Sequence, residues 1–313
     1  MKWLMDILKG FAIGLANVVA GLSGGTIAVI TNAYEDLIDF FSNIATHLLK
    51  ALKKHYKLLI GIALGIVLGA ATLKKLYTAI PLPVTGFFAG LVFISLLPLL
   101  KGLSFKEGKA KNSINIVLLI LCAILLVVLA LASSGDEKEL ALDAKNIFIM
   151  MGLGVLAALA MILPGVSGSM ILLVLGYYTP VLGLVSITAL KNNFTTTFFL
   201  LASFAVGALI GLILGSKVIK KLLAKYTITM NFIIYGLIVG SLIGMIITGI
   251  KANNALILDK GWTFGGKEDI LMHISAIVLF IVGVLCGYLM DYFFSKKTKE
   301  KENLGLEDVN KEE

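Results

Sequence analysis

The chain has 313 residues, of which 58% are hydrophobic and only 15% are charged, and its mean hydropathy is +0.98. A composition this apolar excludes a soluble globular fold and predicts an all-α integral membrane protein that crosses the bilayer several times. All 27 basic residues are lysine. We expect no nucleic-acid partner, no cofactor and no metal site, because the three histidines are scattered away from other metal ligands.

Six apolar runs reach or approach the roughly 20 helical residues that a bilayer crossing needs. They cover residues 58–73, 82–100, 114–132, 197–214, 230–250 and 270–294. Two further apolar segments, 5–41 and 146–190, are interrupted by glycine and serine. We predict that each of these is a re-entrant hairpin, because arms of about 13 to 16 residues are too short to span at 1.5 Å per residue.

The two interrupted segments repeat one another, and the helices that follow them do the same. At an offset of 144 residues the first break recurs as the second, and a row of glycines recurs at an offset of 146. The matching positions are Gly21 with Gly165, Ser23 with Ser167, Gly24 with Gly168, and Gly61, Gly65 and Gly69 with Gly207, Gly211 and Gly215. The chain is therefore a duplicated unit, and paired breaks of this kind are typical of a transporter's binding site.

The distribution of lysine predicts the topology. Four lysines lie in each of the segments 50–57, 101–111, 217–225 and 296–301, whereas the segment 136–145 holds four acids against two lysines. Cytoplasmic loops carry the excess of positive charge, so both termini are predicted to be cytoplasmic. One hairpin plus three crossings is an odd number, so the second copy enters the membrane inverted. The predicted units are repeat 1 (1–134), an external linker (135–145), repeat 2 (146–294) and a disordered cytoplasmic tail (295–313).

The two breaks have the composition of an anion site. Glycine lets backbone approach a ligand closely, proline frees a carbonyl group, and a resuming helix begins with unpaired N–H groups. The candidate ligand-binding residues are Asn17, Gly21, Ser23, Gly24, Gly25, Thr26 and Glu35 in the first copy, and Pro164, Gly165, Ser167, Gly168 and Ser169 in the second. The alternative is that small residues only let helices pack, and we adopt that interpretation for the glycine rows.

Several polar residues near the breaks can also be interpreted without a bound ligand. Glu35 either serves the site or lies at the membrane interface with Asp36 and Asp39. Tyr34 and Tyr178 are interpreted as interfacial anchors, with a cavity-lining role left open. The pair Lys220-Lys221, like Lys74-Lys75, is interpreted as flanking lysines that snorkel to the membrane surface.

The sequence resembles the PopT family of polyprenyl-phosphate translocases. The resemblance rests on NVVAGLSGGT (17–26) followed by Tyr34-Glu35, and on MILPGVSGS (161–169) with Gly176-Tyr177-Tyr178. It implies a prokaryotic plasma-membrane protein whose partner is an anionic polyprenyl lipid. The family returns undecaprenyl phosphate from the outer to the inner leaflet for envelope polymer synthesis. The family usually has aspartate where this chain has Asn17, so a charge-coupling role at that position is in doubt.

Two other functions are weighed against lipid transport. The same site would serve a secondary transporter of a small soluble anion. A polyprenyl-diphosphate phosphatase also fits paired PG-x-S breaks, but such an enzyme generally uses arginine and acid–base groups, and this chain has no arginine. We therefore do not expect an enzyme, and a homo-oligomer is left open.

Overall fold

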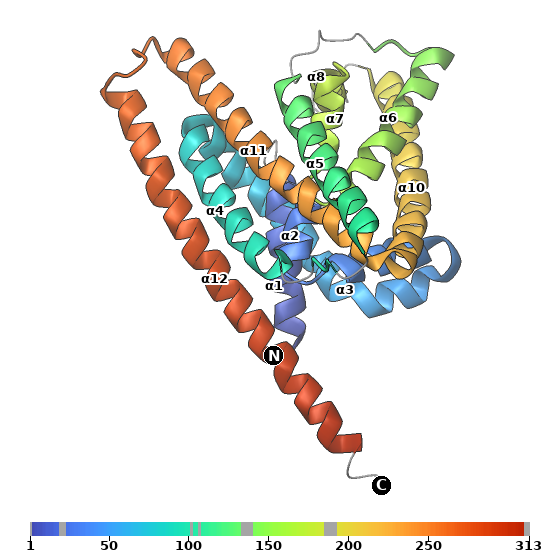
Figure 1. Cartoon of the computed structure of the whole chain (residues 1–313). Helices are drawn as coiled ribbons and strands as arrows, with labels where there is room; N and C mark the ends of the chain where they lie inside the picture. The colour runs from blue at the N-terminus through green and yellow to red at the C-terminus, as the bar shows by residue number, and fades with distance from the viewer. Residues whose placement is uncertain are drawn as a thin grey trace.

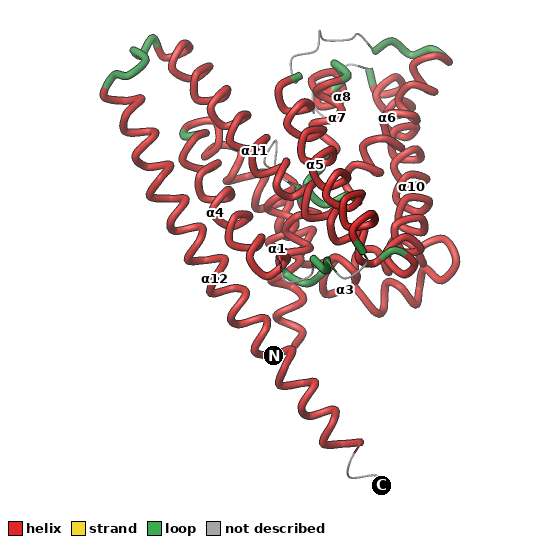
Figure 2. The backbone as a smooth tube through the Cα atoms, in the orientation of Figure 1, coloured by secondary structure: helices red, strands yellow, loops and turns green. Residues whose placement is uncertain are grey.

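The computed structural model describes residues 2–18, 23–100, 103–105, 108–132, 140–184 and 193–309, and within these ranges the regular structure is entirely helical. The helices are α1 (Lys2–Val18), α2 (Gly24–Ile30), α3 (Tyr34–Ala79), α4 (Pro81–Leu100), α5 (Lys109–Leu131), α6 (Ala144–Ile162), α7 (Gly168–Val174), α8 (Tyr178–Leu184), α10 (Phe194–Lys225), α11 (Thr227–Lys260) and α12 (Lys267–Val309). Figure 1 shows them as one bundle, and Figure 2 shows the short loops between them.

Six of the described helices are long and apolar enough to cross a membrane, namely α4, α5, α6, α10, α11 and α12. Five of them match predicted crossings. Helix α6 was predicted as a short hairpin arm but has 19 residues, and α1 has 17, so both first arms are longer than expected. The predicted crossing at 58–73 lies inside α3, which bends at His47 and includes some residues whose side chains lie outside the description.

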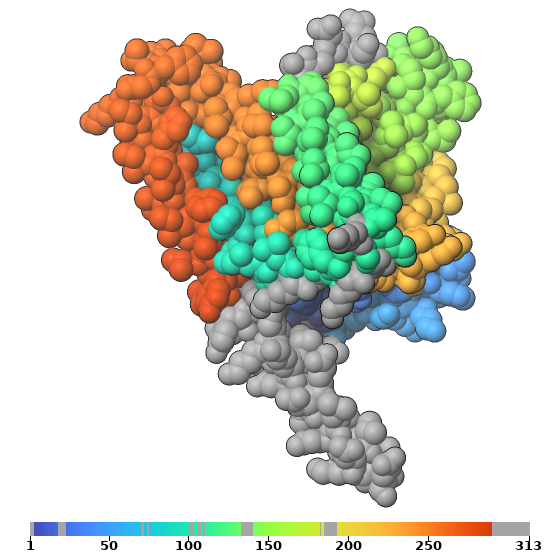
Figure 3. Space-filling view, viewed as in Figure 1, coloured from blue at the N-terminus to red at the C-terminus, as the bar shows by residue number. Residues whose placement is uncertain are grey.

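The helices differ in how far they face outward. Half or more of the span is buried in α4 (61%) and α11 (50%), whereas α5 (17%) and α12 (11%) are mostly exposed. Exposed apolar side chains cover α5 and α12, which form outer surfaces of the molecule (Figure 3). Because lipid tails are as apolar as these side chains, such a surface is stable in a bilayer. The protein is a multi-pass membrane protein with α4 and α11 at its centre.

The connections fall at two opposite ends of the bundle. In Figure 1 both termini, the start of α3, the α4–α5 connection and the α10–α11 junction lie at the lower end. The start of α6, helix α8 and the α11–α12 connection lie at the upper end. The described parts of the lysine-rich segments 50–57, 101–111 and 217–225 therefore lie at the same end of the bundle. Helix α12 continues through Val309, where a disordered tail was predicted, because its lysine and glutamate residues favour helix.

The duplicated sequence is matched by duplicated packing. A Cβ atom on Gly61 would lie 2.1 Å from the carbonyl oxygen of Ile7 in α1, and one on Gly207 would lie 1.9 Å from that of Met151 in α6. These partners are related by the same offsets as the sequences, since Ile7 plus 144 is Met151. Backbones in such contact leave no room for a side chain, so the glycine rows serve helix packing, as the sequence indicated.

Candidate functional site

The two breaks lie against each other in the middle of the molecule. We call Ser23–Thr26 the first elbow and Leu163–Ser169 the second elbow. The Ser23 hydroxyl donates a hydrogen bond to the carbonyl oxygen of Val166 at 3.0 Å. A Cβ atom on Gly25 would lie 3.2 Å from the carbonyl oxygen of Met161 and 3.4 Å from Cα of Pro164. Glycine at 25 therefore lets the backbone of the first elbow approach that of the second.

Both elbows begin a short helix in the same way. Ser23 is extended (φ −110°, ψ 119°) before α2, and Ser167 is extended (φ −106°, ψ 131°) before α7. In each elbow the serine carbonyl accepts the third and fourth amides that follow it. The two amides before those, at Gly24 and Gly25 and at Gly168 and Ser169, donate to no backbone carbonyl among the described residues. With seven residues each, α2 and α7 have weak dipoles, so the donors that the elbows offer are these amides and the nearby hydroxyls rather than a helix dipole.

The hydroxyl groups at the elbows differ in whether they have a hydrogen-bond partner. Thr26 is 2% exposed, and its Oγ1 atom has no hydrogen-bond partner within the described part of the chain. A buried polar group left without a partner costs about 1–3 kcal/mol. The Ser167 and Ser169 hydroxyls lie 2.7 Å apart and share one hydrogen bond. The elbows thus retain a capacity to donate hydrogen bonds that the protein itself does not use.

The second elbow turns at a glycine whose backbone conformation would be strained for any other residue. Gly165 has φ +88°, which L-residues with side chains rarely adopt. A Cβ atom there would lie 2.5 Å from the carbonyl oxygen of Leu237 in α11 and 3.2 Å from the Leu126 side chain in α5. Pro164 is buried beside it. The turn therefore packs against the two neighbouring helices without any space for a side chain.

The candidate residues that flank the first elbow, Asn17 and Glu35, lie in different surroundings. The Asn17 amide donates to the carbonyl oxygen of Ile13 and lies against Gly24, where a Cβ atom would be 2.2 Å from its Nδ2. Asn17 therefore lies beside the first elbow. Glu35 is exposed in the first turn of α3, and no described contact connects it with either elbow. Gly21 lies outside the described residues.

Tyr34 explains why Glu35 is turned away. The Tyr34 side chain is 8% exposed, and its hydroxyl donates to the carbonyl oxygen of Ile162 at 2.9 Å, directly before the second elbow. Consecutive residues of a helix point about 100° apart, so the next side chain is directed elsewhere. The prediction of Tyr34 as an interfacial anchor was wrong, because its hydroxyl connects the two halves of the chain.

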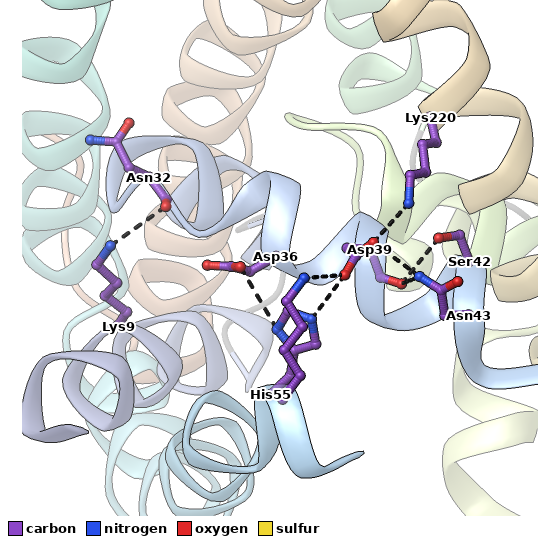
Figure 4. A network of polar contacts seen from close by, with 9 residues as sticks. Lys9, Asn32, Asp36, Asp39, Ser42, Asn43, His55 and Lys220 are labelled. Atoms are coloured by element: carbon purple, nitrogen blue, oxygen red, sulfur yellow. Dashed lines mark hydrogen bonds and ion pairs between the residues drawn. The ribbon is translucent and has the colours of Figure 1, made fainter. Parts of the chain in front are cut away.

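A polar cluster joins α3 to the second half at the lower end of the bundle (Figure 4). The Asp39 carboxylate contacts Lys220 of α10 and Lys54 of α3 at 2.7 Å each, and His55 at 3.2 Å. Asn43 also donates to Asp39 at 2.9 Å. The hydrogen bonds from Lys220 and Lys54 hold the pKa of the Asp39 carboxyl well below its usual range. Lys220 is therefore an ion-pair partner of Asp39, where the sequence indicated a snorkelling lysine.

We expect Asp39→Ala to lower the free energy of unfolding by about 1 kcal/mol, because it removes four contacts of a partly exposed carboxylate that each contribute little. The expected loss shrinks in concentrated salt, which screens such pairs. Thermal unfolding of the purified protein at low and high salt measures both effects. Asp259→Ala is the control, because Asp259 is exposed and makes no ion pair that the described structure shows. Equal losses in the two variants would contradict a role for the cluster.

Sequence reasoning identified the elbows but not this cluster. Asp39, His55 and Lys220 are far apart in the sequence and follow no motif. The only available signal was that an acidic residue follows the first break whereas its repeat counterpart, Gly183, has no charge. Their contact depends on how α3 bends at His47 and packs on α10.

Comparison with known proteins identifies the family of this chain. Residues 13–261 match the model of a family described as undecaprenyl phosphate translocase-like. A polyprenyl-phosphate transporter of Vibrio cholerae is 36% identical over 248 residues, which is 74% of this chain and 74% of that protein. A polyprenyl-phosphate transporter of Staphylococcus aureus is 32% identical over 309 residues, covering 96% of this chain and 99% of that protein. No solved structure matches. The chain, with its paired elbows, belongs to the undecaprenyl phosphate translocase-like family.

Proposed function

We propose that this protein flips undecaprenyl phosphate, or a closely related polyprenyl phosphate, across the membrane, with the phosphate bound between the two elbows. The observation that carries the proposal is the contact of the two serine–glycine breaks through Ser23 and Val166, next to Thr26, whose buried hydroxyl has no hydrogen-bond partner among the residues that the structure describes. A charged head group does not cross hydrocarbon unaided, so a transporter must supply polar groups at depth. The amides of Gly24, Gly25, Gly168 and Ser169, which donate to no backbone carbonyl of the described residues, and the elbow hydroxyls are donors suited to phosphate oxygens.

The proposed architecture is an inverted repeat with two re-entrant hairpins. Helix α1 begins at the lower end of Figure 1 and α6 at the upper end, and equivalent glycines pack α1 on α3 and α6 on α10. Helices α2 and α7 have seven residues, or about 10 Å at 1.5 Å per residue, and are too short to cross. Helix α8, which follows α7, lies at the end where α6 begins. These features support hairpins that enter from opposite faces and meet at their tips.

We propose that the lower end of Figure 1 faces the cytoplasm, with both chain termini on that side. The support is the concentration of lysine in segments 50–57, 101–111 and 217–225 at that end. Transport would run from the outer to the inner leaflet and would return the carrier lipid for envelope polymer synthesis. Cells depleted of the protein are then expected to accumulate the carrier phosphate on their outer surface.

The experiment that tests the proposal uses purified protein in vesicles with a polyprenyl phosphate in the outer leaflet. We expect protein-dependent movement to the inner leaflet that a second polyprenyl phosphate competes with and that inorganic phosphate or sulfate does not affect, because the lipid is the ligand. Competition by inorganic phosphate, with uptake of that ion, would instead identify a soluble-anion transporter. Release of phosphate from a polyprenyl diphosphate would identify a phosphatase. Either result would contradict the proposal.

A further inference from the structure

The first half of the molecule contains an apolar cavity beside the first elbow. Its volume is about 350 Å³, within the range of about 300–1,000 Å³ that is usual for small-ligand pockets. Side chains from α1, α2, α3, α4 and α12 line it, and every lining residue is alanine, leucine, isoleucine, valine or phenylalanine. Such a wall has nothing to offer a phosphate or another polar ligand, so an occupant must be a hydrocarbon.

Helix α2 connects the first elbow to the wall of the cavity. Ile27 and Ile30 line the cavity, and Ile27 directly follows Thr26, whose hydroxyl has no hydrogen-bond partner in the described part of the chain. Thr26 and Ile30 are four residues apart, so they are neighbours on one face of the helix, with Cβ atoms about 5–6 Å apart. Within one turn of α2, the Thr26 hydroxyl could donate a hydrogen bond to a head group and the Ile30 side chain could contact the hydrocarbon chain attached to it.

The cavity also reaches the outer surface. Leu76 of α3 lines it and is 45% exposed, and Leu279 of the outer helix α12 lines it on another side. The opposite wall is deep, since Val84 of α4 is 4% exposed. A chain can therefore run from the surrounding lipid past Leu76 toward the elbow.

We propose that this cavity holds the isoprene units nearest the phosphate of the transported lipid, an inference that rests on the proposed function. The bilayer is as apolar as the cavity, so moving a chain between them gains little hydrophobic energy. Discrimination comes from packing, because contacts with fixed walls depend on the shape of the chain. The rings of Phe87 and Phe88 and the branched side chains of Ile27, Ile30 and Val84 form such walls. The cavity selects for the methyl-branched prenyl chain, and the elbows select for the phosphate.

The test varies chain length at a constant head group. Full-length protein in phosphatidylcholine nanodiscs is titrated with a long-chain polyprenyl phosphate and with dimethylallyl phosphate, which has one isoprene unit. Val84→Phe fills the cavity, and Val278→Phe makes the same change at a position of α12 that is 53% exposed. We expect Val84→Phe to weaken binding of the long-chain ligand about tenfold, or roughly 1.4 kcal/mol, because the added ring takes up space that the hydrocarbon chain would occupy. Dimethylallyl phosphate, whose single isoprene unit can make only a small part of the contacts with the cavity walls, is expected to lose much less affinity for Val84→Phe than the long-chain ligand does, and none for Val278→Phe.

Several results would overturn the inference. If the Val84→Phe and Val278→Phe variants bind the long-chain ligand with equal affinity, the cavity takes no part in binding it. If phosphatidylglycerol competes with the long-chain ligand as effectively as a second prenyl lipid does, the cavity would be assigned to ordinary acyl chains. If Val84→Phe unfolds, Phe87→Ala replaces it, and this enlarged cavity is expected to lose preference for the prenyl chain over a straight-chain alkyl phosphate. By contrast, unchanged protein that binds neither phosphate would refute the proposed function itself.

Discussion

The double substitution of Ser23 and Ser167 by leucine is expected to abolish transport of polyprenyl phosphate in reconstituted vesicles. Each serine precedes two amides that donate to no backbone carbonyl of the described residues, and the Ser23 hydroxyl donates to the Val166 carbonyl of the opposite elbow. Leucine removes both hydroxyls and places branched apolar chains where a phosphate would enter. Without those donors, the head group pays its full desolvation cost at depth, and transport is expected to fall to the rate of protein-free vesicles.

Stability measurements separate this effect from unfolding. Hydrogen bonds inside membrane proteins contribute about 0.6 kcal/mol on average, so Ser23→Ala together with Ser167→Ala costs little stability. That milder pair is expected to fold and still to transport at least tenfold more slowly, because a charge-assisted hydrogen bond contributes about 1.5–3 kcal/mol. Thr72→Leu is the control, since Thr72 is exposed on α3. Unchanged transport in the folded serine-to-alanine pair would remove the elbows from the site.

Gly165→Val is expected to destabilise the protein by about 3 kcal/mol or more and to stop transport. The residue combines a left-handed backbone conformation, φ +88°, with a carbonyl oxygen 2.5 Å from the position a Cβ atom would occupy. Strain of the first kind costs about 1–3 kcal/mol, and overpacking costs a similar amount. The second elbow would have to move away from α11, and its contact with Ser23 would be lost. Thermal unfolding in detergent measures the stability loss.

A matched control is available on the preceding helix. Gly152 lies in α6 with no atom within 4 Å of the position of an added Cβ. Gly152→Val is therefore expected to retain stability and transport. A similar loss of stability in both variants would show that valine is harmful anywhere in this segment and that the elbow geometry is not responsible.

Much of the fold was predictable because it depends on properties that are local in the chain. Hydropathy located five of the six candidate spans, and glycine, serine and proline located both breaks. The offset of 144 residues predicted that Ser23 and Ser167 have the same local role, and their backbone angles agree within about 12°. Each of these features follows from residues within one segment, so no knowledge of packing was needed.

Other features depended on contacts that no local pattern encodes. Hydropathy did not show that α6 runs for 19 residues, because its end is set by Leu163 and Pro164 at the elbow. Aromatic character alone indicated a surface position for Tyr34, yet its hydroxyl is buried against Ile162. A side chain's partner is decided by which helix lies opposite, and that helix is more than a hundred residues away.

From the sequence alone one learns that this is a duplicated, multi-pass membrane protein with two serine–glycine breaks and a strong asymmetry of lysine. These properties follow from the composition of the chain and from its internal repeat, and neither depends on how the helices pack. Only the tertiary structure decided that the breaks touch through Ser23 and Val166, that the Thr26 hydroxyl finds no hydrogen-bond partner among the described residues, and that Asp39 pairs with Lys220. The physical reason is that glycine rows bring α1 to α3 and α6 to α10 at backbone distance, and this packing aligns the two elbows.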